Sequence, residues 1–178
     1  MRVCYTGMNN SIQETGMAAE EKVYEVLDNL GISYEKITHP PVFTVEEADE
    51  HWANLEGTHT KNLFFRNKKG KRHFLVILDS EKSLDIKSLQ SKIGAGTLSF
   101  ASDRRLSEHL GLSKGAVSVF GLINDEKKAV EVVVDNKLLK SKRIGFHPNI
   151  NTATITISLD DFKKFLDSTG NKVSYKEL

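Results

Sequence analysis

Residues 58–79 read THTKNLFFRNKKGKRHFLVILD, and they contain two apolar runs separated by a basic segment. The runs span residues 63–65 and 74–78, and two such runs around a short glycine-containing segment predict a β-hairpin with Gly70 in its turn. Between positions 61 and 72 the stretch has no acidic residue and six basic ones, namely Lys61, Arg66, Lys68, Lys69, Lys71 and Arg72. The sequence therefore predicts a buried strand pair with a cationic tip at its turn. The Lys61 amine is expected at the opposite, open end of the hairpin, which we call its mouth.

The bulk composition is typical of one folded domain. At 178 residues and 39% hydrophobic content, the chain is long enough for one core and short for two. Because the formal net charge is only +1, any nucleic-acid binding must depend on a local patch such as the hairpin tip. No segment approaches the ~20 apolar residues of a membrane span, so no membrane partner is expected. Cys4 is the single cysteine, which favours a reducing, cytoplasmic setting.

Local signals predict the remaining elements. The first sixteen residues are polar and are expected to form a loose tail, with one domain spanning residues 17–178. Capping residues, closing glycines and apolar spacing predict helices at 17–30, 45–52, 86–93, 103–110 and 159–167. Strands are predicted, besides the hairpin, at 32–38, 98–101, 116–120, 129–135, 152–158 and 173–175. Hairpins are prominent and no regular βαβ rhythm is present, so the expected fold class is α+β, with a mixed, largely antiparallel sheet flanked by helices.

The residues alone leave the candidate functional groups open. No phosphate loop, dinucleotide fingerprint, metal motif or nucleophile elbow is present, and the six histidines are scattered, so no metal is expected. Lys61 is either a solvated lysine at the start of a strand or a fixed charge for a phosphate or an oxyanion. The basic tip either discourages edge pairing or contacts RNA phosphates.

Two loop positions carry a similar pair of interpretations. Gly115 forms a helix-to-strand turn, or it allows backbone N–H groups to approach a ligand closely. His147, which precedes Pro148, is a turn residue, or it is a hydrogen-bonding group or proton carrier near neutral pH. Neither position decides the function by itself.

Four stretches occur in one order along the chain: KNLF at 61–64, LSFAS at 98–102, LGLSKGAVSVFGLIND at 110–125 and FHPNINTAT at 146–154. Together they resemble the YbaK/ProX family of aminoacyl-tRNA deacylases, which is related to the editing insertion domain of bacterial prolyl-tRNA synthetases. The resemblance covers roughly residues 17–169. It implies a mixed sheet flanked by helices and hydrolysis of the aminoacyl ester without a metal or other cofactor. The first and last stretches are most similar to the free-standing branch that clears alanine from mischarged proline tRNA.

The resemblance also implies roles for particular residues. The lysine of KNLF is the key functional residue of the family and corresponds to Lys61, with Asn62 beside it in the substrate site. The late histidine corresponds to His147. The family's glycine-x-x-x-proline loop lines the amino-acid pocket and corresponds to Gly115, Ala116, Val117, Ser118 and Val119. Position 119 holds valine where the family usually has proline, which predicts a less rigid loop.

The leading expectation is thus a cytoplasmic trans-editing hydrolase that acts on mischarged proline tRNA, with Ala-tRNA(Pro) as its substrate. The expected partners are that tRNA and prolyl-tRNA synthetase. Because an aminoacyl ester is already reactive, the protein mainly has to position water and stabilise an oxyanion. The alternatives are a deacylase for cysteinyl- or seryl-tRNA, a non-catalytic tRNA-binding or regulatory module, and a small-molecule binding domain without an RNA partner.

Overall fold

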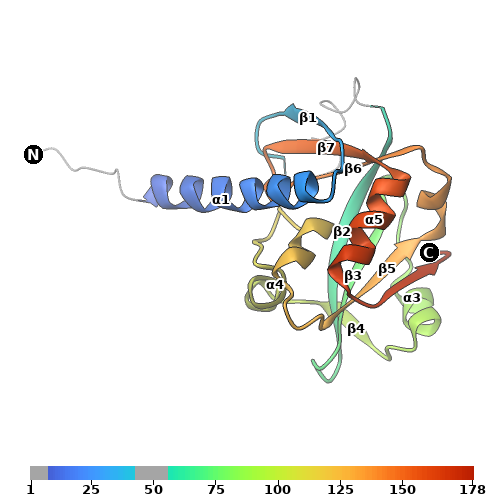
Figure 1. The fold of residues 1–178 in the computed structure, drawn as a ribbon. Coiled ribbons are helices and arrows are strands. Elements are labelled where there is room, and N and C mark those ends of the chain that lie inside the picture. Colours follow the sequence, from blue (N-terminus) through green and yellow to red (C-terminus); the bar gives the residue numbers. More distant parts are fainter. Residues whose placement is uncertain (1–7, 43–55) are drawn as a thin grey trace, which may run out of the picture.

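One mixed sheet of eight strands forms the centre of the fold, in the order β1-β7-β6-β2-β3-β5-β8, with β4 paired to β2. The computed structural model describes residues 8–42 and 56–178 (Figure 1). Four pairings are antiparallel and three are parallel, which confirms the expected mixed sheet. The strands are β1 (Glu35–Thr38), β2 (Thr58–Asn67), β3 (His73–Asp79), β4 (Leu98–Phe100), β5 (Val130–Asp135), β6 (Arg143–Phe146), β7 (Ala153–Ser158) and β8 (Val173–Lys176).

The helices flank this sheet. They are α1 (Met8–Asn29), α3 (Ile86–Ile93), α4 (Asp103–Leu110) and α5 (Leu159–Thr169), with two 3-10 helices, η1 (Val119–Asn124) and η2 (Asn136–Lys140). The first part of α1 extends away from the sheet (Figure 1). This helix begins nine residues before the predicted position 17 and passes through the expected boundary at residue 16. The division into a tail and a domain stays a prediction. The helix predicted at 45–52 lies outside the described residues.

The hairpin and the helix caps confirm the local signals of the sequence. Gly70 has a φ of +66°, and its N–H donates to Asn67 O at 2.8 Å to close the turn. The side chains of Asp85, Ser102 and Ser158 each accept from backbone N–H groups in the first turn of the helix that follows. Such caps satisfy donors that have no partner within the helix, so each helix begins where its capping residue predicts.

Two predictions about strands need correction. Residues 116–120 do not form a strand, because the Ser118 hydroxyl accepts from Phe120 N–H at 3.2 Å and begins η1 there. Val119 and Phe120 are fully buried, so this apolar run reflects core packing around a 3-10 turn. Conversely, β6 was not predicted. It forms because β7 pairs with it along its whole length.

Strand β2 separates two cores. Phe64 belongs to a large cluster that includes Phe162 and Phe165 of α5, whereas Phe65 belongs to a smaller one that includes Leu89 of α3. All residues of β3 are buried, as expected for a central strand that is covered on both faces. The two faces of β2 therefore lead to different parts of the molecule, which matters for the candidate site.

Candidate functional site

Strand alternation separates the two adjacent residues Lys61 and Asn62. Lys61 pairs with Leu78, which belongs to the smaller core cluster, and Asn62 pairs with Ile77, which belongs to the larger one. Directly paired residues of antiparallel strands share a face of the sheet, and successive residues point to opposite faces. The structure therefore places Lys61 on the face of the smaller cluster and Asn62 on the opposite face.

The pairing of β2 with β6 shows what lies beside Lys61. His59 precedes Lys61 by two residues on β2, so the two side chains point to the same face of the sheet. His59 pairs with Gly145 of β6. A Cβ on Gly145 would lie 2.6 Å from His59 Nδ1. The absence of a side chain at Gly145 thus lets the His59 ring lie against β6. Gly145 in turn pairs with Thr156 of β7, which extends the same face across β7.

Two further histidines lie on this face. Thr154 shares the face of Thr156, and its Oγ1 is 3.0 Å from His39 Nε2. The His39 ring contacts the His147 ring edge-on, with 5.9 Å between centroids. We call the side chains of His39, His59, Lys61, His147 and Thr154 the histidine face. The structure thus brings the predicted pair Lys61 and His147 to one face and adds His39 and His59, which the sequence reasoning missed. One signal was available, since His39 and His147 both precede proline.

His147 is arranged to accept a proton. Its Nδ1 is 2.9 Å from the Ala153 carbonyl oxygen, and because a carbonyl only accepts, Nδ1 must carry the hydrogen. Burial lowers the pKa of His147, against the opposing effect of the Ala153 hydrogen bond, and the nearby His39 lowers it further. The ring is therefore neutral at physiological pH, and its lone pair is on Nε2.

Lys61 holds a positive charge at the mouth of the hairpin. Its Nζ donates to Ser80 O at 2.9 Å, and Ser80 N–H donates to His59 O at 2.9 Å. The nearby Asp79 carboxylate is paired with Lys137 at 2.7 Å. Within the described parts of the chain, the Lys61 ammonium makes no ion pair. Its charge is thus available to an anionic ligand.

The predicted loop at 115–119 is joined to His147 through Ser118. The Ser118 hydroxyl donates to His147 O at 2.5 Å. Gly115 has a φ of +91°, which favours glycine. The Ala116 N–H donates to Ser113 O at 3.1 Å, so it is committed to the turn. The Val119 side chain is fully buried in the larger core, and Val117 packs against that core.

Two asparagines, one on β2 and one located two residues after His147, carry buried polar atoms without a hydrogen-bond partner among the described residues. They are Oδ1 of Asn62 and both Oδ1 and Nδ2 of Asn149. Asn149 is 5% exposed and has a φ of +63°. A buried polar group without a partner costs about 1–3 kcal/mol, so these amides are suited to bonds that a substrate completes. The sequence reasoning missed Asn149, for which it offered no local signal.

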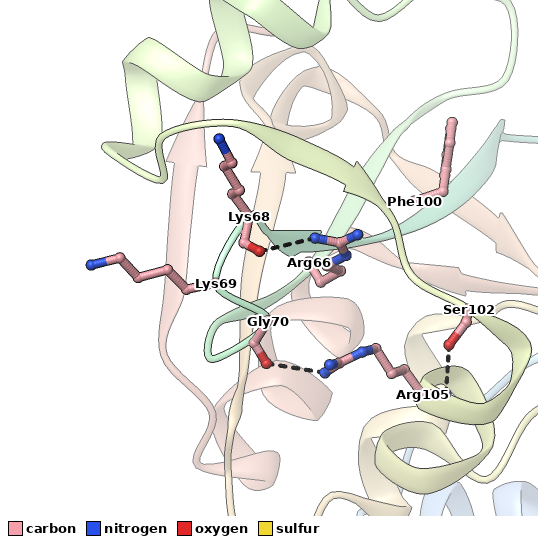
Figure 2. A pocket seen from close by; sticks show the side chains of 7 residues that line it. All are labelled: Arg66, Lys68, Lys69, Gly70, Phe100, Ser102 and Arg105. Carbon is pink, nitrogen blue, oxygen red and sulfur yellow. Dashed lines mark hydrogen bonds between the residues drawn. The ribbon is translucent and has the colours of Figure 1, made fainter.

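The basic residues of the tip fall into two groups. Arg72 makes a two-pronged ion pair with Glu131, at 2.6 and 2.9 Å, and its guanidinium lies over the Phe74 ring, so it is part of the sheet structure. Lys68, Lys69 and Lys71 are exposed. Arg66 donates to Asn67 O and Lys68 O. Arg66, Lys68 and Lys69 line a pocket (Figure 2), from whose lining Lys71 and Arg72 are absent.

Two kinds of site are absent from residues 8–42 and 56–178. No group of three or more His, Cys, Asp or Glu side chains there could hold a metal ion. None of the helices described is long and apolar enough to cross a membrane.

Known proteins resemble this chain over most of its length. The family model for the aminoacyl-tRNA editing domain matches residues 39–165. The prolyl-tRNA editing protein ProX of Acetoanaerobium sticklandii is 44% identical over 162 residues, which cover 91% of this chain and 99% of that protein. The mouse prolyl-tRNA synthetase associated domain-containing protein 1 is 35% identical, with coverage of 87% and 95%. The crystal structure of hypothetical protein APE2540 superposes with a TM-score of 0.67 at 24% identity, covering 85% of this chain and 96% of that one, which supports the fold alone.

Proposed function

This chain belongs to the aminoacyl-tRNA editing domain family, and on that premise we propose that it is a trans-editing hydrolase that removes alanine from mischarged proline tRNA. The observation that carries the proposal is the 44% identity to a prolyl-tRNA editing protein across 91% of this chain and 99% of that protein. The histidine face supports it, because a neutral histidine and a lysine that makes no ion pair among the described residues suit hydrolysis of an ester on a polyanionic substrate.

The proposed reaction needs one proton acceptor. A water oxygen attacks the carbonyl carbon of the aminoacyl ester, the bond from that carbon to the ribose oxygen breaks, and free alanine and tRNA are formed. His147 Nε2 takes the proton from the water, directly or through the neighbouring ribose hydroxyl, and returns it to the leaving ribose oxygen. Its lowered pKa keeps the ring in the accepting form. A positioned general base of this kind accelerates such steps by about 10²–10⁴-fold.

Lys61 and the loop at 115–119 stabilise negative charge in this proposal. The Lys61 ammonium, held by Ser80 O, binds the phosphate of the terminal nucleotide or the oxyanion. Backbone N–H groups of the loop are the other candidates for the oxyanion, and one well-placed donor contributes about 3–4 kcal/mol. Because the Ala116 N–H is bonded to Ser113, the donor would come from its neighbours.

Selection of alanine is then a matter of size and of the amino group. A tight pocket rejects larger residues by clash, which is a stronger filter than the ~1–3 kcal/mol gained from an extra methylene. The Oδ1 atom of Asn149, which has no partner among the described residues, can accept a hydrogen bond from the ammonium group of the substrate. Asn62, which the resemblance predicted in the substrate site, points to the face of β2 opposite Lys61, so we assign the contact to Asn149.

The proposal is tested with wild type, Lys61→Ala and the control Lys164→Ala, which changes an exposed lysine of α5. Each protein is incubated with alanyl-, cysteinyl-, seryl- and prolyl-tRNA(Pro). We expect wild type and the control to hydrolyse the alanyl ester fastest and Lys61→Ala to be slower by about 10²-fold or more. Equal rates for all three proteins would show that Lys61 has no role in the mechanism. No hydrolysis by wild type would refute the proposed enzymatic activity. If wild type hydrolyses cysteinyl- or seryl-tRNA(Pro) faster than the alanyl ester, that aminoacyl-tRNA is the substrate instead.

A non-catalytic tRNA-binding module is the second candidate, because Val119 replaces the usual proline of the family. The local geometry favours the enzyme instead. Val119 is the first residue of η1, and the loop before it is held by the two hydrogen bonds of Ser118. The valine therefore stands in a loop that has other means of staying ordered. Salt-sensitive tRNA binding without turnover would favour the module.

A further inference from the structure

A basic pocket lies at the tip of the β2–β3 hairpin (Figure 2). Its volume is about 380 Å³. We call it the tip pocket, and it is lined by Arg66, Lys68, Lys69, Gly70, Phe100, Ser102 and Arg105. Four of these residues are cationic and none is acidic. The tip pocket therefore attracts an anion with several charges more strongly than a single carboxylate.

Arg105 is held in a fixed position beside the turn. Its Nη1 donates to Gly70 O at 3.0 Å and to His73 Nε2 at 2.8 Å. A Cβ on Gly70 would lie 2.7 Å from Arg105 Nη2, so the glycine allows this close approach. Among the described residues, the side-chain hydrogen bonds of Arg105 all come from Nη1. The other edge of a rigid guanidinium fork is thus available, and such forks match phosphate oxygens.

Phe100 provides an aromatic surface next to these cations. It is 60% exposed, whereas its cross-strand partner Phe65 is fully buried. The two rings stack with 4.6 Å between centroids and 25° between planes. One side of the Phe100 ring is therefore anchored and its other side faces solvent. Unstacked nucleic-acid bases stack on exposed aromatic rings of this kind, and neighbouring cations bind the phosphates.

We propose that the tip pocket binds the acceptor arm of tRNA. Arg66, Lys68, Lys69 and Arg105 contact its phosphates, and an unpaired base stacks on Phe100. The aromatic ring distinguishes this ligand from a phosphorylated protein or a lipid surface, because neither needs a stacking platform. This inference rests on the proposed function, since it assigns the tRNA substrate a second contact away from the reacting ester.

The length of β2 agrees with such a second contact. Lys61 and Arg66 are five residues apart on this strand, which corresponds to about 17 Å at ~3.3 Å per residue. A stacked nucleic-acid strand covers that distance in about five nucleotides at ~3.4 Å each. A nucleic-acid strand of about this length therefore spans the distance from Lys61 to the tip pocket.

Two sets of variants test the two kinds of contact. Lys68→Gln/Lys69→Gln removes two charges from the tip pocket, and Lys127→Gln/Lys164→Gln removes two exposed charges that do not line it. Phe100→Leu keeps an apolar contact with Phe65 but removes the aromatic ring, and Phe100→Trp keeps a ring. Arg105 is left unchanged, because His73 depends on it.

Two measurements are made on each protein. The first is the affinity for uncharged tRNA(Pro) at several salt concentrations. The second is kcat and KM for Ala-tRNA(Pro) and for 3′-O-alanyladenosine, an ester without an acceptor arm. We expect the tip double variant to lower the slope of log K against log salt by about 1.4, at about 0.7 per single-strand phosphate contact. Phe100→Leu should weaken tRNA binding by about 5- to 100-fold, and Phe100→Trp should restore it. Hydrolysis of the short ester should be unchanged.

The outcomes separate this inference from the proposed function. If both double variants bind tRNA alike and Phe100→Leu binds as wild type does, the tip pocket is not an RNA site, whatever the rate of hydrolysis. If the wild type hydrolyses no aminoacyl-tRNA yet binds tRNA through Lys68, Lys69 and Phe100, the inference stands and the enzyme is refuted. Equal loss of activity on the short ester would show damage to the catalytic site and would overturn the binding role.

Discussion

The mouth and the tip of the β2–β3 hairpin each have a nearby histidine with a lowered pKa, but the two rings are bonded differently. Beside the mouth, His147 donates from Nδ1 to Ala153 O and keeps the Nε2 lone pair. At the tip, His73 accepts at Nε2 from Arg105. Burial, helped by His109 and Arg105, lowers the pKa of His73 to about 4. The two hydrogen-bond arrangements thus leave the His147 ring ready to accept a proton and commit the His73 ring to holding an arginine.

From this difference we expect catalysis at the mouth of the hairpin and tRNA binding at its tip. The mouth combines a neutral imidazole with an ammonium that makes no ion pair in the described parts of the chain, which suit steps at the reacting ester. The tip combines exposed lysines, a fixed arginine and an exposed ring, which suit binding. Changes at the mouth should therefore alter kcat, and changes at the tip should alter affinity or stability.

The largest expected effect is at the mouth. His147→Asn keeps a side-chain N–H that can donate to Ala153 O but removes the base. Deacylation of Ala-tRNA(Pro) should slow by about 10²–10⁴-fold in kcat, while affinity for uncharged tRNA stays the same. Single-turnover rates between pH 5 and 9 provide the check. The wild-type acid limb should have its midpoint below the ordinary histidine pKa of about 6.5, and the variant should lack that limb. An unchanged acid limb in the variant would assign the base to another residue.

A smaller effect, on stability, is expected at the tip. Between pH 6.5 and 4 the unfolded chain protonates His73 while the folded protein keeps it neutral, so the free energy of unfolding falls as pH decreases. One such proton contributes up to about 1.4 kcal/mol per pH unit. The titratable and charged groups that act on His73 are Arg105, His109, Asp125 and Glu108.

Urea unfolding at pH 5.0, 5.5, 6.0 and 6.5 measures this slope. His73→Gln keeps an acceptor for Arg105 but does not titrate, so its slope should be shallower by up to one proton. His147 contributes in the same direction and remains in both proteins, so the difference between the slopes belongs to His73. Parallel lines for the two proteins would contradict the role of His73 at the tip, and a difference would sharpen the contrast with the mouth.

The smallest expected effect concerns the loop beside His147. Ser118 has an extended backbone with φ of −143° and ψ of 153°, which is the conformation that a residue before proline prefers. Val119 is the first residue of η1, a position that suits proline. Val119→Pro should therefore raise the free energy of unfolding by about 0.4–1 kcal/mol. Ser118→Ala, which removes the cap, should lower it by about 0.5–2 kcal/mol. Urea midpoints that fall for both variants would show that the loop needs the valine itself.

Local signals predicted most elements correctly, because each acts within a few residues. Gly70 closes the hairpin, and Ser102 and Ser158 begin their helices as expected. The stretch at 116–120 was wrongly predicted to be a strand, since an apolar run can be buried in a 3-10 turn as well as in a strand. Ser118 decides between the two by bonding Phe120 N–H and His147 O, and the second of these bonds joins residues 29 positions apart.

The sequence by itself determined the hairpin, its cationic tip and the helix caps, and through resemblance it predicted functional roles for Lys61 and His147. Only the tertiary structure decided which side chains share a face with them. The pairing of β2 with β6 puts His59 against Gly145, and the hydrogen bond from Thr60 to Gly145 O spans 85 positions. It likewise decided that Phe100 and Arg105 complete the tip pocket while Arg72 is bound to Glu131. The physical reason is that strand pairing and ion pairing are long-range contacts, whereas turns and caps are formed by neighbours in the chain.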